Sequence, residues 1–72
     1  MYMPYINKRY FRVFASLKTG ATRQLGGVWA FNSQDAITIA MDQNKVYLDK
    51  LFDEKITYHV YAEHDTTMPI YK

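Results

Sequence analysis

The chain has 72 residues, no cysteine and a formal net charge of +2. A domain of this length buries only about 60% of the surface that its unfolded chain exposes, so we expect one modest core. The lack of cysteine excludes disulfides, a thiolate zinc site and a cysteine nucleophile. Oligomerisation is then the remaining way to reinforce so small a domain, and we expect a homo-oligomer, with a dimer as the first choice.

Aromatic residues make up 17% of the chain, which is too many for a disordered segment. The charge is unevenly distributed. Residues 1–34 contain no acid and five basic side chains, whereas residues 35–72 contain seven acidic and four basic ones. This asymmetry favours an anionic partner for the first half or, as the alternative, solvated strand edges and turns. The basic residues in question are Lys8, Arg9, Arg12, Lys18 and Arg23.

No repeat or linker divides the chain, so we expect a single compact domain over residues 1–72, with 1–7 and 66–72 as flexible ends. No apolar stretch approaches the roughly 20 residues that a membrane-spanning helix needs. Residues 1–5 also lack the pattern of a signal peptide. Because an absence of cysteine fits a reducing compartment, we expect a cytoplasmic protein that does not bind a membrane.

Residues 8–18 alternate between two sets of side chains, and this period of two, with aromatic and β-branched residues, predicts a strand. One set is entirely apolar: Phe11, Val13, Ala15 and Leu17. Gly20 marks a turn, and residues 23–31 predict the second strand of a hairpin. Gly26 and Gly27 inside this strand indicate a bulge or a close backbone approach.

A helix start follows directly. Asn32 is a favoured N-cap, and Asp35 has the spacing of a capping box, so its carboxylate is expected to reach back to the Asn32 N–H. Polar residues 42–44 interrupt the helical pattern, which leaves either one long helix or two between residues 33 and 54. The apolar positions that recur at steps of three and four are Ala36, Ile37, Ala40, Met41, Tyr47, Leu48, Leu51 and Phe52.

Residues 56–63 predict a third strand, with His59 and Tyr61 on the face opposite to the apolar set Ile56, Tyr58, Val60 and Ala62. The tail around Pro69 is expected to form a short C-terminal edge strand or to fray. The sequence therefore predicts an α+β fold with the order β-β-α-β, in which one helical layer packs on one face of a small antiparallel sheet.

One face of this sheet would stay uncovered. The small residues Val28 and Ala30 suit the helix side, which turns Trp29 and Phe31 outward; the opposite register would make both of them core. An uncovered aromatic patch on a small protein indicates a binding surface. The predicted interface residues are Tyr10, Arg12, Phe14, Trp29, Phe31 and Tyr61.

Catalysis finds little support in the sequence. Neither Ser16 nor Ser33 has a base near it in sequence, and the glycines do not form a phosphate-binding pattern. His59 and His64, even with their acidic neighbours, are too few and too spread along a strand to suggest a metal site. We therefore expect a non-enzymatic protein without catalytic residues, metal or cofactor.

Two binding functions remain open. Aromatic residues and arginine are enriched in protein interfaces, so self-association plus a macromolecular protein partner is the first hypothesis. The alternative is single-stranded nucleic acid, with bases stacked on the sheet aromatics and phosphates held by the basic hairpin, although the RNA-recognition signature is absent. In outline only, a short chain without catalytic residues resembles the small inhibitors and modulators that phages and mobile elements encode.

Overall fold

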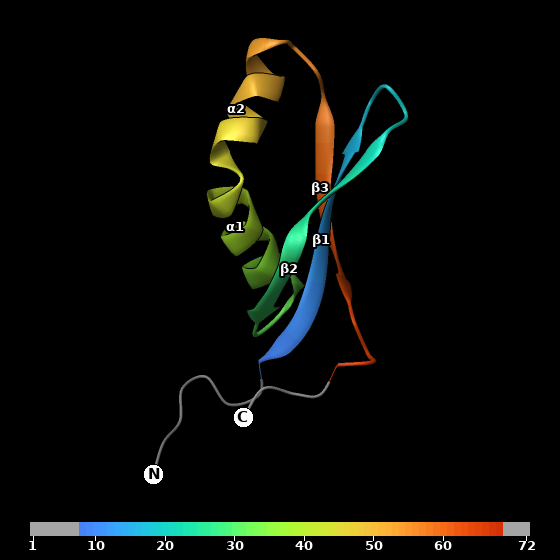
Figure 1. The fold of residues 1–72 in the computed structure, drawn as a ribbon, viewed down its shortest axis with the longest axis vertical. Helices are drawn as coiled ribbons and strands as arrows, with labels where there is room; N and C mark the ends of the chain where they lie inside the picture. The colour runs from blue at the N-terminus through green and yellow to red at the C-terminus, as the bar shows by residue number, and fades with distance from the viewer. Residues whose placement is uncertain (1–7, 69–72) are drawn as a thin grey trace.

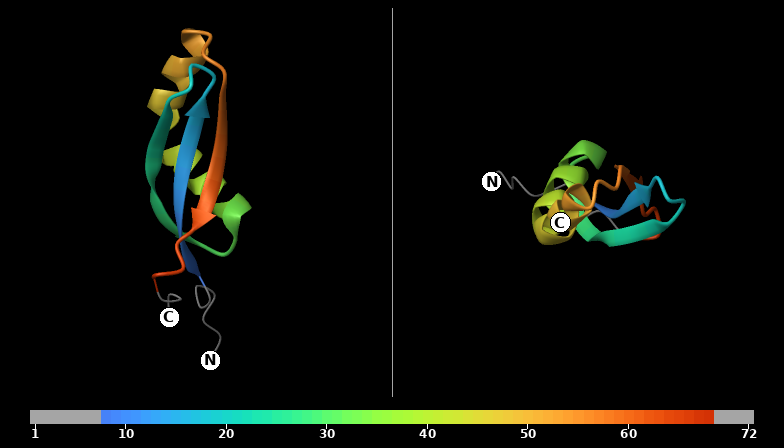
Figure 2. Two further views of the ribbon diagram at one scale, coloured as in Figure 1. Left: turned by 90° about the vertical axis from the view of Figure 1, so that its right-hand side faces the viewer. Right: turned by 90° about the horizontal axis from the view of Figure 1, so that it is seen from above.

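The computed structural model describes residues 8–68 of the chain. Its elements are β1 (Arg9–Leu17), β2 (Thr22–Ala30), α1 (Ser33–Gln43), α2 (Lys45–Asp53) and β3 (Tyr58–His64). The strand order is β2-β1-β3, and β1 runs antiparallel to both neighbours. The two helices lie on the same side of the sheet (Figure 1, Figure 2). The predicted α+β class, element order and single helical layer are confirmed.

The start of α1 follows the predicted capping residues. Asn32 has an extended backbone, and its side-chain oxygen accepts a hydrogen bond from the Asp35 N–H at 2.8 Å. The Asp35 carboxylate accepts from the Phe31 N–H at 3.2 Å, one residue before the expected donor. The first bond satisfies a backbone donor that a helix start leaves unpaired, and the second ties the residue before the N-cap to the first turn of α1.

The helical segment consists of two helices that break at Asn44. The Asn44 side-chain amide donates to the Leu25 carbonyl at 2.9 Å and to the Ala40 carbonyl at 2.8 Å. On β2, Gln24 pairs with Phe14 and Gly26 pairs with Val13, which leaves Leu25 as the extra residue of a bulge. The predicted bulge is therefore confirmed, and Asn44 ties the helix break to it.

The core between the sheet and the helices is small. Among the described residues, the largest side chain that is fully buried is that of Val13. Met41 and Phe52 were expected in the apolar stripe, but this was wrong: both are exposed, Phe52 by 78%. Leu48 and Leu51 of the same stripe are buried, as expected. The buried apolar residues are Phe11, Val13, Ala15, Leu25, Val28, Ala30, Ala36, Ala40, Leu48 and Leu51.

The end of α2 delays the start of β3. Lys55 adopts a left-handed conformation with φ 59°, and the N–H of Ile56 donates to the Leu51 carbonyl at 2.9 Å. With the bond from the Lys55 N–H to the Phe52 carbonyl, this is a Schellman motif. Since Ile56 belongs to the helix end, β3 begins at Tyr58, two residues later than the sequence predicted.

Beyond β3, residues 66–68 form a turn in which the Met68 N–H donates to the Asp65 carbonyl at 3.3 Å. The rest of the expected flexible ends, residues 1–7 and 69–72, lies outside the described residues, as does the expected C-terminal edge strand around Pro69. Neither of the two described helices offers an apolar stretch of the length that a bilayer requires.

Candidate functional site

Aromatic side chains gather on the face of the sheet that the two helices leave uncovered. Val28 and Ala30 are buried on the helix side, so Trp29 between them projects from the opposite face. The outward orientation of Trp29 predicted from the sequence is what the structure shows. We term this surface the open sheet face and define it by Tyr10, Arg12, Phe14, Trp29, His59 and Tyr61.

The rings of the open sheet face pack against each other across the strands. Tyr10 and Trp29 meet edge to face, with ring centroids 5.2 Å apart. Phe14 stacks on Tyr61 at 5.4 Å, and Tyr61 lies 6.4 Å from His59. The first four rings are half-buried, and His59 is exposed. Mutual packing therefore reduces their contact with water without covering the face as a whole.

Gly27 allows Tyr10 to lie flat on this face. A Cβ atom at Gly27 would stand 1.8 Å from the Tyr10 hydroxyl oxygen, which is far inside van der Waals contact. The sequence indicated a bulge or a close backbone approach at the glycine pair, whereas the group that lies close to Gly27 is an aromatic side chain. An aromatic ring over a strand glycine fills the space that the missing side chain leaves.

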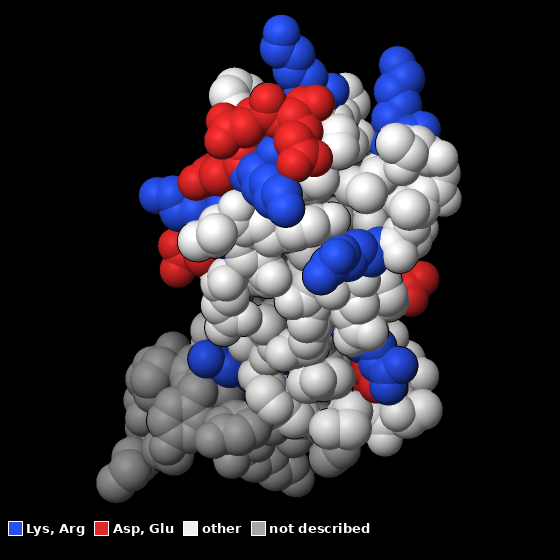
Figure 3. All heavy atoms as spheres, turned by 45° about the horizontal axis from the view of Figure 1, so that its top comes forward, with Lys and Arg blue, Asp and Glu red and all other residues white. Residues whose placement is uncertain are grey.

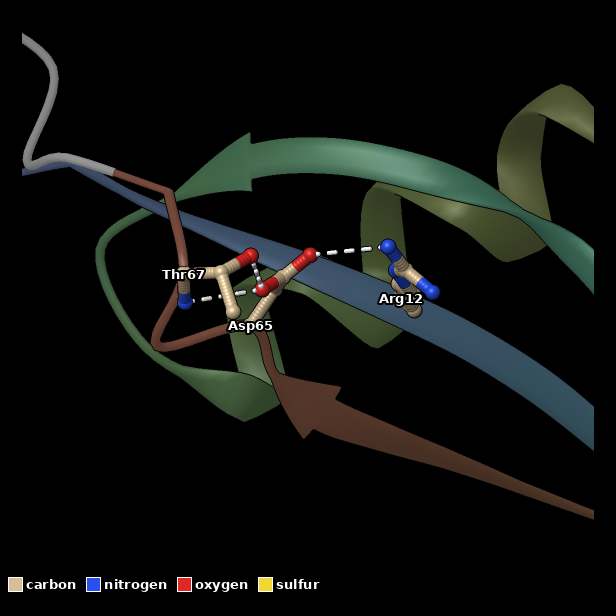
Figure 4. Close-up of polar contacts among 3 residues, drawn as sticks. All are labelled: Arg12, Asp65 and Thr67. Atoms are coloured by element: carbon tan, nitrogen blue, oxygen red, sulfur yellow. Dashed lines mark hydrogen bonds and ion pairs between the residues drawn. The ribbon is translucent and has the colours of Figure 1, made fainter.

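Arg12 is held by Asp65, the first residue after β3 (Figure 4). Its Nη2 atom lies 3.0 Å from Asp65 Oδ2; the Asp65 side chain is 8% exposed and that of Arg12 is 55% exposed. Asp65 Oδ1 accepts from the Thr67 N–H at 2.9 Å and from the Thr67 hydroxyl. Buried Asp65 Oδ2 has no hydrogen bond of good geometry from any described residue, so the charge of Arg12 compensates it.

The surroundings of Asp65 favour its charged form. The Thr67 hydroxyl and then the Thr67 N–H lower the pKa of Asp65, burial opposes them, and the positive charge of Arg12 adds to the lowering. The sequence alone does not identify Asp65 as the partner of Arg12. The Asp-x-Thr pattern in the sequence indicates a turn, since aspartate often accepts a hydrogen bond from the backbone N–H two residues later. The approach of this aspartate to Arg12 depends on the register of β1 with β3.

Phe31 lies just beyond β2 and is 45% exposed. The Lys8 ammonium lies 5.3 Å from the centroid of its ring, within the range of a cation–π contact. Lys18, beyond the other end of β1, is exposed. Phe31 and Lys8 therefore extend the open sheet face at one end of the hairpin.

The predicted basic residues do not gather on one side of the sheet. Arg9 pairs with Ala30 and Arg23 pairs with Ala15, and both alanines are buried on the helix side. The Arg23 guanidinium lies over the Tyr47 ring of α2, 4.6 Å from its centroid. Arg12 is thus separated from Arg9 and Arg23 by the thickness of the sheet.

Charges of both signs are mixed on the surface of the helical layer. Figure 3 shows acidic and basic side chains side by side over the α2 end of the molecule. The exposed charged residues of α2 and of the turn that follows it are Lys45, Asp49, Lys50, Asp53, Glu54 and Lys55. This region therefore does not present an electrostatic potential of a single sign.

Within residues 8–68, no three histidine, aspartate or glutamate side chains lie close enough together to hold a metal ion. A hollow of about 630 Å³ at the α2–β3 junction is lined by Phe52, Asp53, Lys55, Ile56, Thr57 and Tyr58.

Comparisons with protein-family models, curated proteins and solved structures gave no match.

Proposed function

We propose that the chain is a non-enzymatic binding protein that self-associates and holds a protein partner on its open sheet face. The observation that carries this proposal is the set of adjoining rings on the uncovered side of the sheet. Aromatic residues around a central arginine have the composition of interface hot spots. A small domain of this kind is compatible with an inhibitor or modulator that occupies a surface of its partner. The absence of cysteine is compatible with a location in the cytoplasm.

Charge favours a protein over a nucleic acid as the occupant. Arg12 stands opposite Glu63 in the β1–β3 pairing and forms its ion pair with Asp65. A nucleic-acid backbone lying along this face would meet these two carboxylates, whereas phosphate binding depends on uncompensated lysine and arginine. Arg9 and Arg23, on the helix side, do not add to the charge beside the stacked rings.

The proposal is tested with Trp29→Ala and Phe14→Ala, each immobilised beside the unchanged chain and a Phe52→Ala control. Phe52 is a matched control because it is also aromatic and is more exposed, but lies on the helical layer. The immobilised proteins are incubated with an extract of the cells that naturally produce this chain. We expect one protein of the extract to bind the unchanged chain and the Phe52→Ala control, but neither open-face variant. Once purified, this protein should shift the emission of Trp29, the only tryptophan.

Circular dichroism of each variant separates binding from folding. Removal of a half-buried ring is expected to cost about 1–2 kcal/mol of stability, which leaves the variants folded. If both open-face variants unfold, these rings are core and the proposal fails. If a single-stranded oligonucleotide quenches Trp29 and added salt restores the emission, the open sheet face is a nucleic-acid surface instead.

A further inference from the structure

The two outer strands of the sheet differ in how well their free edges are protected. β2 contains the bulge at Leu25 and Gly26, where φ is 145°, and such irregularities discourage a further strand from pairing. β3 pairs with β1 over seven consecutive residues without a register shift. Its sequence, Tyr58–His64, contains no glycine, proline or lysine, which are the residues that usually protect an edge.

The free edge of β3 offers a regular row of backbone groups. The Lys18 N–H donates to the Thr57 carbonyl and the Asp65 N–H donates to the Tyr10 carbonyl, both at 2.9 Å. Odd-numbered residues of this segment therefore bond to β1. Because bonding direction alternates along a strand, the even-numbered residues of β3 direct their N–H and carbonyl groups to the other edge. No described strand pairs with that edge.

We propose that β3 pairs antiparallel with β3 of a second copy of this chain, about a twofold axis at Tyr61. With Tyr61 opposite its counterpart, all seven residues of β3 find a partner. Val60 then stands opposite Ala62, and Tyr58 opposite His64. These are the residues whose backbone groups point to the free edge, so about eight hydrogen bonds can form between the copies.

The side chains of β3 are complementary to themselves in this register. His59 of one copy stands opposite Glu63 of the other, and the symmetry creates this pair twice. An imidazole beside a carboxylate can donate a hydrogen bond, and hydrogen-bonded cross-strand pairs stabilise a sheet. The two Tyr61 rings meet at the axis, at a position without mutual backbone bonds, where opposite side chains come closest.

Edge pairing leaves the open sheet face available. A twofold axis perpendicular to the sheet keeps both helical layers on one side, so the two open sheet faces adjoin and form one continuous surface. Trp29 lies on β2, which β1 separates from the paired edge. This inference rests on the self-association proposed above and assigns it to the β3 edge, which borders the open sheet face at His59 and Tyr61.

Single cysteines test the register, because the chain has none of its own and a disulfide can form only between copies. Tyr61→Cys should oxidise to a covalent dimer, since residue 61 faces itself across the axis at the Cα distance of about 4.5 Å of a pair without mutual bonds. His59→Cys, on the same strand and the same face, should stay monomeric in denaturing electrophoresis, because its counterpart is about four residues away.

Charged substitutions at residues 59 and 63 test the same pairing without replacing Tyr61. In sedimentation velocity, His59→Glu should weaken the dimer on the order of tenfold, because it places two acids opposite each other twice. Glu63→Lys alone should also weaken it, whereas an equimolar mixture of the two variants, or the double variant, should restore dimers. Restoration by the mixture requires that residue 59 of one chain face residue 63 of the other.

A dilution series of the unchanged chain, followed by sedimentation velocity and by the emission of Trp29, separates this inference from the proposed function. We expect the sedimenting species to change from dimer to monomer while the emission stays constant. A chain that is monomeric at all concentrations overturns edge pairing and leaves partner binding by the open sheet face to its own test. A dimer in which Trp29 emission shifts on dilution, or in which both cysteine variants cross-link equally, means that the copies associate through the open sheet face, and also overturns edge pairing.

Discussion

Asn44 connects the break between the helices to the bulge in β2, and its replacement should lower the stability of the whole domain. The Asn44 amide is the partner of the Leu25 carbonyl, which belongs to the extra residue of the bulge. Removing one partner of a part-buried hydrogen bond costs about 1–3 kcal/mol. Asn44 lies at the break between the two helices, so the helix propensity of alanine does not offset this loss, and we expect Asn44→Ala to cost about 1–2 kcal/mol.

Urea unfolding followed by far-ultraviolet circular dichroism measures this loss, at one fixed protein concentration. For a domain of this size the expected loss corresponds to a decrease in Tm of roughly 4–16 °C. Asn44→Asp keeps the size of the side chain but replaces the amide donor by an acceptor that faces two carbonyl oxygens, so it should cost more than Asn44→Ala. Gln43→Ala, an exposed neighbour, is the control and should stay within about 0.5 kcal/mol of the unchanged chain.

The reasoning is refuted if Asn44→Ala unfolds at the same urea concentration as Gln43→Ala. Water would then replace the amide at the Leu25 carbonyl, and the contact between the helix break and the bulge would contribute nothing to stability. A change in the slope of the transition instead of its midpoint would indicate that the variant alters the compactness of one of the two states.

Three further predictions concern Gly27, Lys55 and Asp65. Gly27→Ala should displace the Tyr10 ring and change the Trp29 emission while altering stability by less than about 1 kcal/mol, because the clash falls on the free end of a side chain; unchanged emission would contradict the contact. Lys55→Gly should raise the stability by about 0.5–1 kcal/mol in urea unfolding, since Lys55 has φ 59°; a loss would contradict a strained helix end. The lowered pKa of Asp65 stabilises the fold above the ordinary aspartate pKa of about 4, and this contribution decreases as the pH falls through and below that value. Asp65→Asn should therefore be less stable than the unchanged chain near pH 6, with a difference that shrinks towards pH 3; a constant difference would rule out linkage.

Local patterns in the sequence were sufficient to predict the three strands, the helical segment and the facing of β1 and β2. The alternation in residues 8–18 separates Phe11 and Val13 from Tyr10 and Phe14, and the structure keeps this separation. Asn32 and Asp35 mark the start of α1 because capping depends on residues only three apart. The small size of Val28 and Ala30 identified the helix side of β2, which in turn placed Trp29 on the open sheet face.

Features that depend on distant parts of the chain were not predictable in this way. The sequence marks residues 42–44 as polar, but the contact of Asn44 with Leu25 requires the bulge and the helical layer to be placed together. The ion pair of Arg12 with Asp65 likewise requires the register of β1 with β3. The exposure of Phe52 depends on the new phase of α2 after the break.

The distribution of small and large side chains in this protein links its stability to binding. The core between the layers includes Ala15, Ala30, Ala36 and Ala40, whereas the large rings lie on the open sheet face. Small residues let α1 approach the sheet closely, but they bury little apolar area. Complete burial of a large apolar side chain is worth about 1.5–3 kcal/mol, and part of that energy is released only when another molecule covers the half-buried rings. A partner that binds the folded chain alone should therefore raise its unfolding midpoint in proportion to the logarithm of the partner concentration, and Trp29→Ala should reduce this increase by weakening the affinity.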